Sequence, residues 1–193
     1  MALKLTTPPS TYPVTLAEAK LHCRIDVADD DALVTALITA ATDEVDHKLG
    51  RAIMAQTWTL TLDTFPDAIE LTRVPVQSVT SVKYFDTNGT QQTLSPSLYS
   101  VDLSDDFSFG YIVPSYNTTW PDTRDQINAV EVIYVAGYAN AAAVPQLIKT
   151  WVLLRIAALY ENREAWTMGR DVINENPAVD RLLDRYRVGL YAA

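Results

Sequence analysis

Apolar residues recur at helical spacing near the start of the chain. Thr15 and Glu18 form a capping-box pattern, so a short helix is expected from residue 16 to about residue 23. A second helix is expected after three consecutive aspartates at 29–31, whose carboxylates suit a helix N-terminus, and it should end at Gly50. Its apolar positions are Leu33, Leu37, Ala40, Ala41, Val45 and Leu49.

Helical spacing returns near the end of the chain. Pro145 suits the first turn of a helix that should run to about residue 165. Its apolar face is predicted at Leu147, Ile148, Trp151, Leu154, Ala158 and Leu159. After a loop over 167–175, Asn176 and Pro177 provide a cap and a first-turn proline for a short last helix.

Between these helices the apolar positions alternate, which is typical of strands. Strands are expected at 57–62, 69–71, 79–85, 91–94, 99–103 and 129–135, with a loop over 105–125. Asn88-Gly89 predicts a hairpin with a type I′ turn. The pattern therefore predicts an α+β fold: a bundle of about four helices, two N-terminal and two C-terminal, with an inserted antiparallel β region.

This pattern also divides the chain into three parts. Residues 1–13 contain three prolines and no periodicity, so they are expected to form an extended N-terminal arm that a neighbour must hold. Residues 14–55 and 137–193 should pack together as a helical core domain. Residues 56–136 form the β-rich insertion.

Charge changes the picture of what the chain can bind. The 193 residues carry a net charge of −9, which disfavours gripping nucleic acid through its phosphates. The balance is uneven, with eight basic and eighteen acidic residues over 1–148 but seven and six over 149–193. The C-terminal part is either a solvated helical surface or a segment that docks on an acidic partner.

No residue pattern points to catalysis, a cofactor or a metal. The chain has one cysteine, Cys23, and two histidines, His22 and His47, so a zinc site is not expected. No phosphate-binding glycine motif and no nucleophile motif is present. The longest apolar run, 151–160, is too short for a membrane span and contains Arg155.

Two alternatives remain open for the β insertion. Its carboxylates at 102–106 could serve a hydrolase as acid and base. Its aromatic residues Tyr111, Tyr116 and Trp120 could line a carbohydrate or small-ligand site. The same aromatic side chains also suit a protein interface.

Several segments in order resemble the tailed-phage head–tail connector (adaptor) proteins, and in particular the longer, β-inserted members of siphophages, prophages and gene transfer agents. The similar segments are Pro13-Val14-Thr15-Leu16-Ala17-Glu18-Ala19-Lys20, Leu49-Gly50-Arg51-Ala52, Gln56-Thr57-Trp58, Arg73-Val74-Pro75-Val76-Gln77-Ser78-Val79, Tyr134-Val135-Ala136-Gly137-Tyr138, Tyr160-Glu161-Asn162-Arg163-Glu164 and Leu182-Leu183-Asp184-Arg185-Tyr186-Arg187. Residues 168–174 and the loop over 104–128 match nothing in that family.

The resemblance implies a structural protein without enzymatic activity or cofactor. It implies a homo-oligomeric ring, normally of twelve subunits, that sits below the portal, extends the DNA channel and offers an attachment surface to a stopper or tail-joining protein. DNA would pass without sequence-specific binding, and no membrane is involved. Assembly would occur in the host cytoplasm, and the final location would be the portal vertex of a virion or phage-like particle.

The resemblance also assigns surfaces to residues. The portal-docking residues it implies are Arg181, Leu182, Leu183, Arg185, Tyr186 and Arg187. Contacts to the next ring are expected on a different ground from the aromatic loop residues Tyr111, Tyr116 and Trp120, because Tyr and Trp are enriched at protein interfaces.

Overall fold

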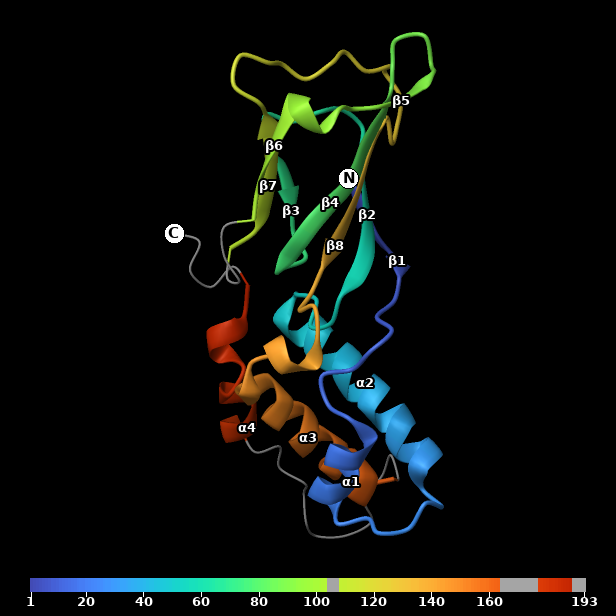
Figure 1. The fold of residues 1–193 in the computed structure, drawn as a ribbon, viewed down its shortest axis with the longest axis vertical. Helices are drawn as coiled ribbons and strands as arrows, with labels where there is room; N and C mark the ends of the chain where they lie inside the picture. The colour runs from blue at the N-terminus through green and yellow to red at the C-terminus, as the bar shows by residue number, and fades with distance from the viewer. Residues whose placement is uncertain (104–107, 164–176, 189–193) are drawn as a thin grey trace.

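The computed structural model describes residues 1–103, 108–163 and 177–188, and it has an α+β fold. The helices gather at one end of an elongated molecule and the strands at the other (Figure 1). The helices are α1 (Leu16–Cys23), α2 (Asp31–Leu49), α3 (Gln146–Glu161) and α4 (Pro177–Arg181), with short 3₁₀ turns at Pro96–Leu98, Ala141–Ala143 and Asp184–Tyr186. The strands are β1 (Ala2–Thr7), β2 (Gln56–Leu62), β3 (Ile69–Leu71), β4 (Val76–Phe85), β5 (Gln91–Thr93), β6 (Tyr99–Asp102), β7 (Gly110–Pro114) and β8 (Val130–Ala136).

The strands form two antiparallel sheets. One has the order β1-β2-β8-β4-β5 and the other the order β3-β7-β6. Inward residues of both sheets, such as Leu60, Val132, Leu71 and Ile112, form one apolar core. The predicted antiparallel β region is therefore confirmed, and the alternation in β2 and β8 is what lets one face of each strand enter this core.

A second apolar core lies among the helices. α1 contacts α2 and α3, α2 contacts α3, and α3 contacts α4. The core collects Val34 and Ile38 of α2, Trp151 and Ile156 of α3, and Leu183 beyond α4. The predicted capping box is present, because Thr15 accepts from the backbone N–H of Glu18 and the Glu18 carboxylate accepts from that of Thr15.

The buried face of α2 agrees with the predicted one at Ala41, Val45 and Leu49, and it differs from it in the first half of the helix. Val34 and Ile38 are buried, whereas Leu33 and Leu37 are only partly buried and Ala40 is exposed. The aspartates ahead of α2 also differ from the prediction. Asp30 occupies the N-cap position without capping the helix, and its carboxylate accepts instead from Tyr160 and Arg163 of the distant α3 end.

Two strands were not predicted. Residues 2–7 form β1, which pairs with β2 of the same chain, so this extended segment does not depend on a neighbour. β7 lies inside the expected loop over 105–125 and pairs with both β3 and β6.

The predicted hairpin between β4 and β5 is confirmed, but its turn is not type I′. Gly89 has φ 83° while Asn88 does not have positive φ, because the Asp86 carboxylate accepts the N–H groups of Asn88 and Thr90 and shapes a longer loop.

Candidate interaction surfaces

The junction between helices and sheets is organised by Asp46 near the end of α2. Its carboxylate accepts the backbone N–H of Ile53 at 2.9 Å and the side-chain amide of Gln56 at 2.7 Å. Burial raises the pKa of Asp46 to about 6, and the two hydrogen bonds only partly oppose that rise. The carboxylate thus fixes the direction in which the chain leaves α2 and enters β2.

A second junction residue, Arg51, is fully buried. Its guanidinium donates to the hydroxyl of Tyr138 at 3.2 Å and to the backbone carbonyl of Tyr186 at 3.3 Å. Arg51 thereby joins the end of α2, the segment that follows β8, and the C-terminal segment. Gly137, just before Tyr138, has φ 108°, and a Cβ there would lie 2.1 Å from the Met54 carbonyl oxygen, so this crossing requires glycine.

The C-terminal segment over 177–188 is held against the helices by Asp180. Lys48 Nζ donates to both of its carboxylate oxygens at 2.8 and 2.7 Å, and the Trp151 indole N–H donates at 3.1 Å. The hydrogen bond from Lys48 is the largest cause of the lowered pKa of Asp180. The backbone N–H of Val188 also donates to Leu49.

The six residues predicted to dock on a portal therefore divide into two groups. Leu183 and Tyr186 are buried in the helical core, where they hold the segment in place. Arg181 and Arg185 are exposed, and Leu182 and Arg187 are partly buried. In this conformation only the exposed and partly exposed members can meet another protein.

The aromatic residues at the β end also differ in exposure. Tyr116 is 92% exposed, whereas Tyr111 is partly buried. Trp120 stacks on Phe65 with ring centroids 4.7 Å apart and an interplanar angle of 7°, so one face of its ring is already covered. Of the carboxylates considered for catalysis, Asp102 ends β6, while Asp105 and Asp106 lie outside the described residues.

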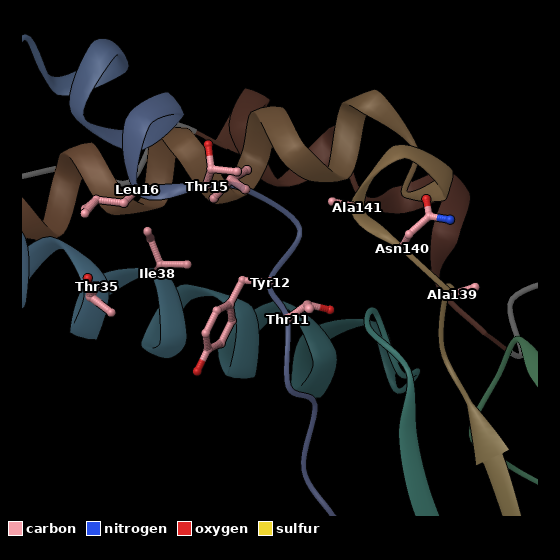
Figure 2. A pocket seen from close by; sticks show the side chains of 10 residues that line it. Thr11, Tyr12, Thr15, Leu16, Thr35, Ile38, Ala139, Asn140 and Ala141 are labelled. Carbon is pink, nitrogen blue, oxygen red and sulfur yellow. The ribbon is translucent and has the colours of Figure 1, made fainter.

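The helical end carries an uncharged groove of about 480 Å³, called here the α1–α2 groove. Tyr12 lies beside Ile38 of α2, and Thr35 lies on the other side of Ile38, with Thr15 and Leu16 opposite them at the start of α1 (Figure 2). Ala139, Asn140 and Ala141 close one end, and Thr11 and Val14 complete the lining. All ten lining residues are uncharged, and nothing among them could act as a general acid or base at neutral pH.

Among the described residues, no three His, Cys, Asp or Glu side chains gather as they would to hold a metal ion. No helix within the described ranges is long and apolar enough to cross a membrane.

Comparison with known families settles the class of protein. The model of the phage gp6-like head-tail connector proteins matches residues 13–116, which is more than half of the chain. The chain belongs to this family. Connectors of this family are structural virion proteins and not enzymes, so the hydrolase alternative is set aside. No curated protein matches the chain.

Solved structures share the fold of this head–tail connector over nearly its whole length. A chain in the virion of a native gene transfer agent particle is 22% identical with a TM-score of 0.79. Chains in the neck of the empty particle, computed with C6 symmetry, and of the native particle, computed with C12 symmetry, are 23% and 21% identical with TM-scores of 0.76 and 0.74. Each comparison covers 97% of this chain and 96% of the other.

Proposed function

We propose that this connector forms a ring of twelve copies below the portal of a tailed phage or a gene transfer particle. The ring extends the DNA channel and offers its far side to a stopper or tail-joining protein. The family match over residues 13–116 carries this proposal, and the fold shared with neck proteins of a particle computed with C12 symmetry supports it. Subunits would assemble in the host cytoplasm and end at the head–tail interface.

Charge supports passage of DNA without binding. Residues 56–136 hold ten acidic and three basic side chains, within a chain of net charge −9. Such a surface repels phosphates, and it lacks the clustered cations that grip a nucleic acid. DNA would therefore slide past the ring without sequence-specific contacts.

The division of the chain suggests which end meets which partner. We take residues 14–55 and 137–193 as one helical bundle that carries the portal-docking surface, and 56–136 as the part that meets the next ring. Arg181 and Arg185 are the exposed cations of the C-terminal segment, and Leu182 and Arg187 lie beside them. Tyr116 is 92% exposed at the other end, with Tyr111 and Trp120 nearby in the chain.

Portal binding tests the proposal. Arg181→Glu with Arg185→Glu should weaken co-sedimentation with rings of the portal protein of the same particle by at least about tenfold, because the charge that faces the portal is reversed. Arg24→Glu with Arg124→Glu is the matched control, since it changes two exposed arginines elsewhere by the same charge. Equal binding by both double variants would refute the portal-docking assignment, and no binding by the wild type would refute the connector position.

A further inference from the structure

Between residues 147 and 158, one side of helix α3 carries uncharged side chains that the helical core does not use, and the exposed Glu161 lies on the same side at the end of the helix. Leu147 is 40% exposed, Ala158 is exposed, and Thr150, Leu154 and Ala157 are partly buried. These five residues, called here the α3 stripe, fall on one side of the helix at about 100° per residue. In the part of the chain that the structure describes, none of them belongs to the helical core cluster.

The α3 stripe and the α1–α2 groove lie on opposite sides of the helical layer. α1, α2 and α3 all contact one another, so the buried side of α3 faces the seam between the other two helices. That side carries Ile148, Trp151, Val152 and Ile156, and the stripe lies about half a turn away from it. The groove, in contrast, is built on the α1 and α2 side of the layer (Figure 2).

This arrangement is the one that a rotationally symmetric ring requires. In such a ring each subunit uses two different surfaces, one toward each neighbour, and the two must point in nearly opposite directions. Charge narrows the choice of surfaces further. Copies that each carry −9 repel one another, and a contact between two uncharged surfaces avoids placing like charges opposite each other.

We propose that the α1–α2 groove of one subunit receives the α3 stripe of the next copy of the same chain. This inference rests on the proposed ring and identifies its subunit interface. Leu147 and Leu154 are the apolar side chains that would enter the groove, against Tyr12, Leu16 and Thr35. Burial of these apolar atoms would supply the attraction between like-charged subunits.

The test uses two variants of the full chain that break opposite sides of the same contact. Leu147→Glu with Leu154→Glu breaks the stripe, and Thr11→Glu with Thr35→Glu breaks the groove; three of the four positions are exposed and Leu154 is partly buried. Leu98→Glu is the control, because Leu98 at 41% exposure matches Leu147 at 40% and lies at the β end. Native mass spectrometry measures the oligomer, and circular dichroism checks that each variant is folded.

We expect the wild type and the Leu98→Glu control to oligomerise and each double variant to be monomeric. Mixing the two double variants should give a heterodimer and nothing larger. The stripe variant keeps an intact groove and the groove variant keeps an intact stripe, so each pair can form only one contact. Oligomers that persist in a folded double variant, or a mixture that stays monomeric, would overturn this interface. A wild type that never self-associates would overturn the interface as well, whereas the connector position is judged separately by portal binding.

Discussion

The helical end and the β end of this connector are held together by different interactions. Helices satisfy their own backbone groups, so side chains must join one helix to another. Here Lys48–Asp180, Arg155–Glu44 and Arg163–Asp30 connect segments more than a hundred residues apart. At the β end, backbone hydrogen bonds join neighbouring strands of the sheet β1–β2–β8–β4–β5. Lys83–Glu131 at 3.8 Å is the one ion pair in the described part of that end.

This difference accounts for the distribution of charge. Several cations of the helical end are paired with carboxylates, and Arg51 is buried, whereas Arg181 and Arg185 are exposed. Most carboxylates of the β end have no cation partner within the described residues. The helical end is therefore the part that depends on particular side chains. The β end can vary its side chains, because its hydrogen bonds do not depend on them.

The largest expected effect comes from removing a tryptophan at each end. Trp151 is 2% exposed and also binds Asp180, so Trp151→Ala should lower the free energy of unfolding by about 3–5 kcal/mol. Trp58 of β2 is only partly buried under the guanidinium of Arg73, so Trp58→Ala should cost roughly half as much. Urea unfolding followed by circular dichroism measures both. Equal losses would contradict the contrast between the two ends.

The junction between the ends should respond to pH through Asp46. Its folded pKa of about 6 lies above its ordinary value of 3.8, so the folded state binds the proton more tightly and this residue's contribution to stability falls as pH rises from about 4 to about 6. The shift corresponds to an upper limit of about 3 kcal/mol. In Asp46→Asn the amide of Gln56 can rotate to accept from the new side chain, so both hydrogen bonds survive.

The measurement is the difference in unfolding free energy between Asp46→Asn and the wild type at several pH values. The variant should gain on the wild type as pH rises through this window, and the two should converge below about pH 4. A difference that stays constant across the window would show that Asp46 titrates at its ordinary pKa.

Sequence predicted the parts of this fold that depend on neighbours in the chain. The capping box at Thr15 and the alternation in β2 are local patterns, and both are confirmed. The sequence did not predict β1 because nearly all its side chains are exposed, so the strand shows no apolar alternation. It is held by backbone pairing with β2 and by hydrogen bonds from threonine side chains. The sequence did not predict β7 because the strand begins at Gly110 and ends at Pro114, and both residue types are typical of loops.

The interaction surfaces were predicted less well for a similar reason. Arg51 is buried because Tyr138 and Tyr186, 87 and 135 residues away, surround its guanidinium, and no local pattern carries that information. The resemblance placed Leu183 and Tyr186 in a docking segment without indicating which face of the segment is buried. Only the packing against α3 separates them from the exposed Arg181 and Arg185.

The smallest expected effect compares one ion pair from each end. Lys48→Gln and Lys83→Gln should each cost about 0.2–1 kcal/mol, because both pairs are partly exposed. Lys48→Gln should lower the free energy of unfolding more, since the Lys48 ammonium donates to both oxygens of Asp180 while the Lys83 ammonium is 3.8 Å from Glu131.

The pKa of Asp180 is lowered below its ordinary value of 3.8 in the folded state. The stability that the Lys48 pair contributes is therefore fully present above pH 3.8 and is lost as pH falls through the lower folded pKa. Thermal unfolding at neutral and acidic pH measures the loss of stability in both variants. A larger loss in Lys83→Gln than in Lys48→Gln would contradict the view that side-chain ion pairs matter more at the helical end than at the β end.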